Sequence, residues 1–540
     1  MYMKKKTIVS LLLSVTMLCS MLTGCGESSK ITENKISYKY EQELHIVDDN
    51  YRNYYEIYVG SFYDSDGNGM GDLKGVIEKL DYIEYMGFNG IWLMPVMQSP
   101  SYHKYDVSDY KSIDYQYGTV DDFKALVEAC HEKGINVVID MVINHTSANH
   151  KWFTQACQYL KGLEEGEKLD LEECPYVGYY QFTNEKSGGT YYKVDGSKGW
   201  CYEGSFWSGM PDLNLENEAV RRELEEVADF WLDMGVDGFR MDAALHFEEN
   251  NSTFNNEVLD WLYSYCKEQN PDFYMVSEVW AGVASIAEYY SSGTPSMFNF
   301  DTASAEGIIA KSARGTFAAE LLVDRMVSYQ EQFSAVNPDY IDAPFLSNHD
   351  QVRISNSLAN NEEHLKMAAG MLLMMNGSPF VYYGEEIGMA SKGTKDENKR
   401  IPMVWSVTDT TGATRGPADA DKGITSAFEA VDEQLKDGHS LLNYYRRALR
   451  LRNENPEIAR GEIEKIDALC EGNIAVLTKT WEGSTIAIVY NNGDTELTLD
   501  IKGSEIDGMG IRGYLTLNGE EVAMKDGVVT MPKKSICILK

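Results

Sequence analysis

Short apolar runs and amphipathic stretches alternate along most of the chain from residue 54 onward. Eight runs are strand-like, and they cover residues 55–62, 90–96, 136–143, 236–242, 273–280, 297–301, 344–350 and 378–384. Amphipathic, helix-like stretches separate most of them, for example residues 121–133 and 218–234. Eight continuous apolar strands that alternate with helices are typical of an α/β fold, the parallel (β/α)₈ TIM barrel.

The alternation stops in two places. Residues 146–212, after the third run, are rich in Gly, Tyr and polar residues and indicate an inserted irregular domain. A last helix at residues 441–453 ends near Pro456, and alternating runs follow at residues 475–479, 484–490, 496–501, 528–531 and 536–539. These predict a C-terminal antiparallel β-sandwich. We therefore divide the chain into a barrel of residues 49–145 and 213–456, an inserted domain of residues 146–212 and a C-terminal domain of residues 457–540.

The N-terminus has the pattern of a targeting segment. Lys4, Lys5 and Lys6 precede an apolar stretch at residues 8–21, and Leu22-Thr23-Gly24-Cys25 follows. An apolar stretch this short predicts a cleaved signal at residues 1–24 and not a membrane span. The last four residues resemble a bacterial lipobox, which implies lipidation of Cys25 and an exported protein anchored at the cell surface. The alternative is an ordinary signal peptide with an incidental Cys. Residues 25–48 are polar and predict a tether.

The composition of the chain limits the kinds of molecule that we expect it to bind. The chain has 540 residues, is 43% hydrophobic and carries a formal net charge of −36. Its length allows a large core and two or three domains. Such an acidic surface argues against nucleic acid as a partner and suits a neutral substrate and a solvated, exported protein. We expect a monomer.

The cysteines favour neither a disulfide framework nor a zinc site. Cys19 lies in the predicted signal, and seven cysteines remain beyond Cys25, an odd number without metal-ligand spacing. A single bridge among Cys157, Cys174 and Cys201 stays open as an alternative.

Acidic residues follow three of the apolar runs, at Asp242, Glu278 and Asp350. Acids at the C-terminal ends of barrel strands are candidate catalytic residues. Glycoside hydrolysis needs two carboxylates, separated by roughly 5–5.5 Å in a retaining mechanism. Arg240 shares a strand face with Asp242 and would keep it ionised as a nucleophile, although an isolated Arg-x-Asp is more often a structural ion pair. Trp280 could supply the apolar surroundings that keep a proton on Glu278.

Several longer motifs occur in order along the chain. They are Asp140-Met-Val-Ile-Asn144-His145, Gly238-Phe-Arg240-Met-Asp242-Ala-Ala-Leu-His246, Glu278-Val-Trp280 and Ser347-Asn348-His349-Asp350. Further matches are Tyr102-His103-Lys104-Tyr105-Asp106, Met210-Pro-Asp212-Leu-Asn214 and the eighth-strand region 377–388. From about residue 50 to residue 540, the chain resembles the α-amylase family of glycoside hydrolases, family 13.

The resemblance implies a role for each motif residue. Asp242 would be the nucleophile, Glu278 the general acid/base and Asp350 the stabiliser of the distorted sugar. Substrate contacts are implied for His103, His145, His349, Tyr105, Arg240, Trp280, Asp106 and Arg400. In relatives of the exo-acting type, the pair that corresponds to Asp106 and Arg400 closes the site into a pocket. Trp280 and Trp207 are either sugar platforms or core residues.

Two positions bear on specificity. Leu245 stands where α-amylases of the family usually have a Lys that contacts the leaving-group side. Ala243, next to the nucleophile, resembles the residue of enzymes that cleave α-1,4 bonds. We therefore expect retaining, extracellular hydrolysis of α-1,4-glucosidic bonds in starch-like glucans. The alternatives are an exo-acting α-glucosidase or oligo-1,6-glucosidase, a neopullulanase-type activity, or a non-catalytic glycan-binding protein.

The string Asp64-Ser-Asp66-Gly-Asn68-Gly-Met70-Gly-Asp72 predicts a Ca²⁺ site. Oxygen-bearing side chains at alternate positions of a tight Gly-rich loop suit this hard cation, although the distal Glu of an EF-hand is missing. The alternative is a turn with solvated acids. The resemblance implies a second calcium site at Asn144, Asp212 and the backbone of His246.

Overall fold

The computed structural model describes residues 46–540, apart from residues 165, 187, 392 and 422–427. The predicted signal peptide, Cys25 and most of the predicted tether therefore lie outside the described residues. In the part of the chain that is described, no helix combines the length and the apolar character needed to cross a bilayer.

Eight parallel strands form the centre of the molecule. They are β1 (Tyr54–Ile57), β2 (Gly90–Leu93), β3 (Asn136–Met141), β7 (Gly238–Met241), β8 (Tyr274–Ser277), β9 (Ser296–Asn299), β10 (Ala343–Pro344) and β11 (Phe380–Tyr382). Their order is β10-β9-β8-β7-β3-β2-β1-β11, and a parallel bridge between Phe345 and Phe380 joins the two ends. The predicted (β/α)₈ barrel is confirmed. Most strands end earlier than the apolar runs do, because the last residues of those runs leave the sheet for the loops.

The barrel interior changes from apolar to charged along the strands. Inward-facing apolar side chains pack together near the N-terminal ends, including Tyr54, Trp92, Val138, Phe298 and Phe380. Side chains two residues apart share a face of a strand, so Glu56 and Asp140 follow Tyr54 and Val138 on the inner face. Arg240 pairs in register with Asp140 on the neighbouring strand. The strands thus carry charges only toward their C-terminal ends.

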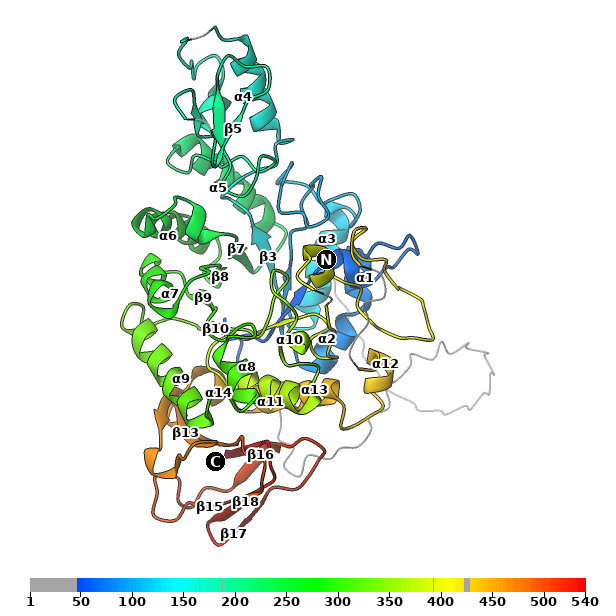
Figure 1. The fold of residues 1–540 in the computed structure, drawn as a ribbon, viewed down its shortest axis with the longest axis vertical. Helices are drawn as coiled ribbons and strands as arrows, with labels where there is room; N and C mark the ends of the chain where they lie inside the picture. The colour runs from blue at the N-terminus through cyan, green and yellow to red at the C-terminus, as the bar shows by residue number, and fades with distance from the viewer. Residues whose placement is uncertain (1–45, 165, 187, 392, 422–427) are drawn as a thin grey trace, which may run out of the picture.

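Helices surround this barrel (Figure 1). The longer ones are α1 (Leu73–Glu78), α2 (Leu80–Met86), α3 (Val120–Glu132), α5 (Glu218–Leu232), α6 (Ser252–Gln269), α7 (Val283–Tyr289), α8 (Ile308–Ala313), α9 (Ala319–Ser334), α11 (Glu362–Leu373) and α13 (Leu441–Glu454). Short helices are α10 (Ile354–Ser357), α12 (Val431–Gln434) and α14 (Glu457–Arg460). In α3, Thr119 and Asp122 form a capping box, and the buried residues recur at helical spacing.

A separate lobe extends from one end of the barrel (Figure 1). It contains α4 (Lys151–Gly162) and a three-stranded sheet of β4 (Phe182–Thr183), β5 (Tyr191–Lys193) and β6 (Cys201–Glu203). The lobe falls within the predicted insertion, although its helix was not predicted. Cys157, Cys174 and Cys201 are all free, so the bridge left open among them is not formed.

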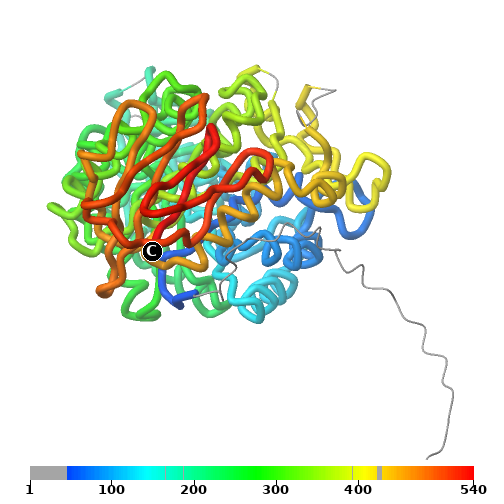
Figure 2. Tube along the Cα trace, turned by 90° about the horizontal axis from the view of Figure 1, so that it is seen from below, coloured from blue at the N-terminus to red at the C-terminus, as the bar shows by residue number. Residues whose placement is uncertain are grey.

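The C-terminal region forms two packed antiparallel sheets, seen from below in Figure 2. One contains β12 (Glu462–Lys465), β13 (Ile474–Trp481), β14 (Ser484–Asn491), β19 (Ser535–Leu539) and β16 (Ile511–Leu515), and the other β15 (Leu497–Asp500), β18 (Val528–Met531) and β17 (Ala523–Lys525). Apolar side chains such as Val489, Val529 and Leu539 share one core between them. The predicted β-sandwich is confirmed. β12, β16 and β17 were not predicted.

Candidate active site

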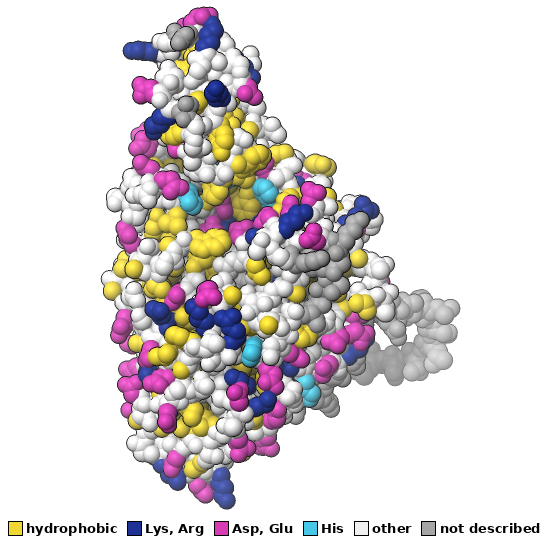
Figure 3. All heavy atoms as spheres, in the orientation of Figure 1, with side chains coloured by type: hydrophobic (Ala, Val, Ile, Leu, Met, Phe, Trp, Pro, Cys, Tyr) yellow, Lys and Arg dark blue, Asp and Glu magenta, His cyan; other side chains and the backbone are white. Residues whose placement is uncertain are grey.

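A pocket of about 260 Å³ lies over the charged ends of the barrel strands. The predicted site residues that line it are His103, Tyr105, His145, Asp242, His246, Glu278, Trp280, Asp350 and Arg400. Figure 3 shows histidine, acidic and hydrophobic side chains gathered in the hollow between the lobe and the barrel. The barrel therefore brings most of the predicted catalytic and substrate-contact residues into one cavity, whereas Arg240, His349 and Asp106 do not line it.

Arg240 lies beneath the pocket and contacts three carboxylates. Its Nη1 bonds to Asp140 and lies 2.6 Å from Asp242 Oδ1, and its Nη2 lies 3.0 Å from Glu278 Oε2. The guanidinium is fully buried. Burial lowers the pKa of Arg240, but the surrounding carboxylates raise it by a larger amount. The net pKa is therefore well above its ordinary value. A permanent positive charge thus holds Asp242 and Glu278 close to each other.

Glu278 is placed to carry a proton. It is 8% exposed, and burial is the largest cause that raises its pKa, with nearby acids adding to the effect and Arg240 opposing it. Its Oε2 also accepts a hydrogen bond of 3.0 Å from the backbone N–H of Ala243. Ala243 adopts a left-handed conformation with φ of 49°, a strained geometry for a residue other than glycine. The turn after Asp242 therefore points a backbone donor at the second carboxylate.

Asp350 has the opposite electrostatic surroundings. Its Oδ2 lies 3.1 Å from His349 Nε2, and its Oδ1 lies 2.9 Å from Arg400 Nη2. Burial alone raises the pKa of Asp350, but these two cations bring it well below its usual range. Asp350 therefore stays ionised, whereas burial shifts the pKa of Glu278 upward.

His349 links Asp350 to the base of the pocket. Its Nδ1 lies 2.5 Å from Glu56 Oε1, and its ring stacks on Tyr105 with centroids 5.4 Å apart. The Tyr105 hydroxyl is 2.7 Å from His349 Nε2. Burial lowers the pKa of His349, but Asp350 and Glu56 raise it to about 10. The imidazolium is fully buried and does not line the pocket, so it contacts the pocket residues Asp350 and Tyr105 from below the surface.

Arg400 does not bond to Asp106. It contacts Asp350 and Asp396, and its Nη1 lies 3.2 Å from the hydroxyl of Tyr102, which itself bonds to Asp396. Asp106 instead accepts hydrogen bonds from Ser99 and Ser101. The Asp106–Arg400 pair of the exo-acting alternative is therefore not formed. Asp396 precedes Arg400 by four residues in a helical turn and so reaches it first. We call Tyr102, Asp350, Asp396 and Arg400 the charged wall.

Another part of the pocket lining is apolar. Leu245, Phe206 and Trp280 line it, and we call these three the apolar wall. Trp280 is 50% exposed and stacks on Phe300 with centroids 4.9 Å apart. Trp207 is also half exposed, but it does not line the pocket.

Two histidines offer hydrogen bonds to a ligand. The buried Nε2 of His145 has no partner among the described residues, and burial lowers the pKa of this imidazole. Burial also lowers the pKa of His103, whose Nδ1 is 3.2 Å from Ser101 Oγ. Neutral imidazoles facing a pocket suit contacts with uncharged hydroxyl groups.

The predicted calcium loop brings its acids together beside the barrel. Among the described residues, Asp64, Asp66 and Asp72 are the one group of three or more His, Cys, Asp or Glu side chains with converging ligand atoms, all within 4.8 Å of one another. Asp64 also accepts backbone hydrogen bonds from Gly67 and Gly69, of 2.8 and 2.6 Å. The converging hard oxygens fit Ca²⁺.

The residues of the second predicted metal site join the lobe to the barrel. Asn144 Nδ2 lies 3.5 Å from Asp212 Oδ1, and an antiparallel bridge connects His145 to Asp212. Asp212 accepts two further hydrogen bonds from Ser205, and burial raises its pKa to about 6. His246 Nδ1 bonds to Glu249. A carboxylate and an amide meet here, so the donor types fit Ca²⁺ as well.

Four residues of this network were not assigned roles from the sequence: Asp140, Glu56, Asp396 and Tyr102. Glu56 and Asp140 are single acids inside apolar strands, a pattern that predicts a buried polar partner. Asp396 and Tyr102 carry no comparable signal, since only the folded loops bring them to Arg400.

The comparisons with known proteins agree with this geometry. The family profile "Alpha amylase, catalytic domain" matches residues 56–461. The chain belongs to the α-amylase family of glycoside hydrolases.

Three relatives illustrate its range. The chain is 37% identical to alpha-amylase 3 of Dictyoglomus thermophilum over 451 residues, which cover 83% of this chain and 86% of that protein. It is 27% identical to a glucan 1,6-alpha-glucosidase of Streptococcus pneumoniae over 541 residues, covering 90% and 97% of the two chains. The structure of Eubacterium rectale Amy13B has a TM-score of 0.89 and 42% identity, covering 92% of this chain and 96% of that one. These relatives thus include an alpha-amylase and a glucan 1,6-alpha-glucosidase.

Proposed function

We propose that the protein is a retaining hydrolase of α-1,4-glucosidic bonds in starch, maltodextrins and related α-glucans. The arrangement of Asp242 and Glu278 on the two Nη atoms of Arg240 carries this proposal. Oxygens held by neighbouring nitrogens of one guanidinium are only a few ångströms apart. Such a separation fits the roughly 5–5.5 Å spacing of retaining pairs better than the roughly 6.5–9.5 Å of inverting pairs.

The chemistry divides between the two acids. Asp242 attacks the anomeric carbon, while Glu278 gives its proton to the departing glycosidic oxygen. Glu278, now ionised, then takes a proton from water as that water displaces Asp242 and releases the sugar. The raised pKa of Glu278 favours the first proton transfer. Asp350, held ionised by its cations, stabilises positive charge on the sugar ring in both steps.

Three features support α-1,4 cleavage within chains over the α-1,6-cleaving and exo-acting alternatives. Ala243 lines the pocket beside Asp242, the position at which the sequence resembles α-1,4 enzymes. The Asp106–Arg400 pair that would close the pocket is not formed. The D. thermophilum relative is named an alpha-amylase.

Product analysis on soluble starch, pullulan and isomaltose tests the proposal. We expect short malto-oligosaccharides from starch and little release from isomaltose. Preferential cleavage of isomaltose would favour an oligo-1,6-glucosidase, and release of glucose alone from starch would favour an exo-acting enzyme. Binding without any cleavage would favour a glycan-binding protein.

We also propose that the loop of residues 64–72 binds a structural Ca²⁺. A ligand that binds only the folded state raises stability by mass action. Chelation should lower the melting temperature, and Asp66→Ala should reduce that response. Asp195→Ala, at an exposed acid of the lobe, is the matched control. An unchanged chelator response and metal content in Asp66→Ala would contradict the proposal. Ca²⁺ at Asn144, Asp212 and the His246 backbone is a second proposal, tested by metal content in Asp212→Ala.

We propose further that the protein is exported and anchored through lipid on Cys25. The basic residues, the apolar stretch and Leu22-Thr23-Gly24 before Cys25 support this. Stable attachment takes two or more lipid chains, which a fully modified N-terminal Cys supplies. Cys25→Ser should release the protein or leave it unprocessed. Unchanged partition of that variant into detergent would contradict the proposal.

A further inference from the structure

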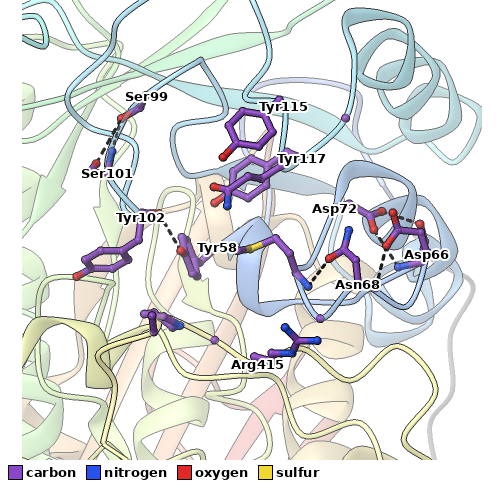
Figure 4. Close-up of a pocket in the computed structure, with 18 of the residues that line it drawn as sticks. Tyr58, Asp66, Asn68, Asp72, Ser99, Ser101, Tyr102, Tyr115, Tyr117 and Arg415 are labelled. Carbon is purple, nitrogen blue, oxygen red and sulfur yellow. Dashed lines mark hydrogen bonds between the residues drawn. The ribbon is translucent and has the colours of Figure 1, made fainter. Parts of the chain in front are cut away.

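Two large cavities lie at opposite ends of the barrel. The first, of about 900 Å³, is on the active-site side, and Figure 4 shows Tyr117 and Arg415 among the residues around it. Tyr102 lines this cavity and also belongs to the charged wall, so the cavity is part of the site already described. The second cavity has a volume of about 530 Å³, which is within the range of ligand pockets.

The second cavity lies where the barrel meets the C-terminal domain, and we call it the junction cavity. Of its lining residues, Tyr340 and Asp342 precede β10, and Asn376 and Gly377 precede β11. Helix α9 and the connection from α14 to β12 complete the lining, and both helices pack against β13 of the C-terminal sheet (Figure 1). The candidate catalytic residues follow the other ends of the strands, so the barrel separates the junction cavity from the active site.

Asp342 is a buried carboxylate without a cation. It is 4% exposed, and its Oδ2 accepts a hydrogen bond of 3.1 Å from Asn299 Nδ2. Among the described residues, its Oδ1 has no hydrogen-bond partner and no basic side chain forms an ion pair with it. Burial raises the pKa of Asp342 to about 7, although the hydrogen bond from Asn299 opposes this shift. A buried charge without a partner costs free energy, which a bound donor would recover.

Asn376 provides a second unpaired oxygen in the same cavity. Its Nδ2 donates to the Gly461 carbonyl at 2.6 Å, which fixes the orientation of the amide. Its buried Oδ1 has no partner in the described part of the chain. Gly377, with φ of +82°, brings this segment against Asp342, since a Cβ there would come within 1.9 Å of the Asp342 carbonyl oxygen. Neighbouring segments thus present two acceptors that lack donors.

The remaining charges of the lining favour a cation. Glu331 and Glu462 are exposed acids at the edge of the cavity. Arg460 is the one basic residue of the described lining, and its Nε and Nη2 already bond to the two carboxylate oxygens of Asp49, at 2.7 and 2.6 Å. The lining therefore attracts positive charge and disfavours an anionic ligand.

A primary ammonium group matches the inner part of the cavity. It has three N–H donors and no acceptor, so it suits the unpaired oxygens of Asp342 and Asn376. A hydroxyl group also donates, but it does not supply the positive charge that a buried carboxylate lacks. The exposed acids offer partners for a second ammonium, and the rings of Tyr51 and Tyr340 offer apolar surface for a carbon chain between the two.

We propose that the junction cavity binds an aliphatic diamine, with one ammonium on Asp342 and Asn376 and the other near Glu331 and Glu462. Such a ligand joins residues of the barrel to β12 of the C-terminal domain, and it stabilises the folded state by mass action. The inference does not depend on the proposed function, because none of these residues lines the catalytic pocket.

Calorimetry and thermal melting with 1,4-diaminobutane test the proposal. The measurements use constant ionic strength and about pH 8, where alkyl amines are still protonated. We expect the diamine to bind and to raise the melting temperature. Butylamine, with one ammonium, should bind about fivefold more weakly, and 1,4-butanediol, which has similar length and no charge, should not bind. Equal binding of the diol, or no binding of the diamine, would overturn the inference.

Two variants locate the bound diamine. Asp342→Asn removes the inner charge with little change in shape and should weaken diamine binding at least about tenfold. Glu331→Gln combined with Glu462→Gln should weaken diamine binding about fivefold and leave butylamine binding unchanged. Glu268→Gln, at an exposed acid of α6 outside the cavity, is the matched control.

The double variant keeps the test decisive if Asp342→Asn does not fold, because both of its positions are exposed. Diamine binding that stays unchanged in either variant would overturn the inference. An equal loss for the diamine and for butylamine in the double variant would do the same, since only the diamine carries a second ammonium.

Discussion

The charged wall and the apolar wall of the pocket differ in charge, and we expect them to have different roles in the reaction. On the charged wall, Arg400 holds Asp350 and Asp396, and His349 supports Asp350 from beneath. On the apolar wall, Leu245 and the half-exposed Trp280 offer surface without fixed charges. A preorganised charged network stabilises charge that develops on the reacting sugar, whereas an apolar surface accepts varied partners with little orientation. We therefore expect changes to the first wall to affect catalysis and changes to the second to affect the choice of leaving group.

The largest effect should come from the two acids between the walls. Asp242→Asn and Glu278→Gln should each reduce kcat on starch by at least about 10³-fold, because each removes a step that binding cannot replace. Circular dichroism should show both variants folded. Asp237→Asn is the control, since Asp237 precedes the same strand at its other end and bonds to His131. Near wild-type turnover in either active-site variant would refute the assignment of roles.

The next effect should come from the charged wall. Arg400→Leu leaves Asp350 and Asp396 without their shared cation, and truncating one partner of such a pair costs about 2–5 kcal/mol. We expect kcat/KM to fall about 10²-fold for short and long substrates alike. Arg400→Lys, which keeps the charge but not the forked geometry, should recover part of the loss. A loss confined to long substrates would show that the charged wall does not act on the reacting sugar.

The pH dependence of stability should reflect His349, which contacts Asp350 of the charged wall. The pKa of His349 rises from 6.5 to about 10 on folding. Protonation therefore stabilises the fold fully below about pH 6.5, and this contribution is lost as the pH rises through about 10. Denaturant titrations should show that His349→Gln destabilises the protein most near pH 6 and progressively less up to pH 10. A constant difference across that range would mean that the imidazole stays neutral.

The smallest effect should come from the apolar wall. Trp280→Ala removes a ring that stacks on Phe300, and such contacts contribute about 0.5–1.5 kcal/mol. We expect kcat/KM to fall roughly 2–10-fold, more for maltosyl than for nitrophenyl leaving groups. Trp207→Ala, at an equally exposed ring outside the pocket, is the control. A uniform loss with every leaving group would place Trp280 in the structural core instead.

The sequence predicted the barrel well because its strands are buried on both sides and appear as continuous apolar runs. It missed β12 (Glu462–Lys465), in which charged and apolar residues alternate, and β17, which has only three residues. It also missed α4, whose amphipathic pattern lies within a segment rich in polar residues.

In the site, the motifs named acids and histidines that the barrel brings together, although His349 and Asp106 do not line the pocket, and the roles of these residues stay predictions. The partners of Arg400 were not predicted, because only the folded loops bring Asp396 and Tyr102 to its guanidinium. The left-handed backbone conformation of Ala243 could not be predicted from the sequence either, since alanine rarely adopts it.

In the proposed mechanism, Asp242 forms a covalent bond to the retained sugar. A fluorinated glucosyl fluoride slows both steps, because the ring fluorine withdraws electron density and disfavours positive charge on the sugar. Its good leaving group still lets the first step proceed, so the glycosyl-enzyme accumulates. Peptide mass mapping of the inactivated enzyme measures where the sugar is attached. We expect a single labelled peptide with the sugar on Asp242. A label on another carboxylate, or no label while the enzyme turns over maltoheptaose, would contradict it.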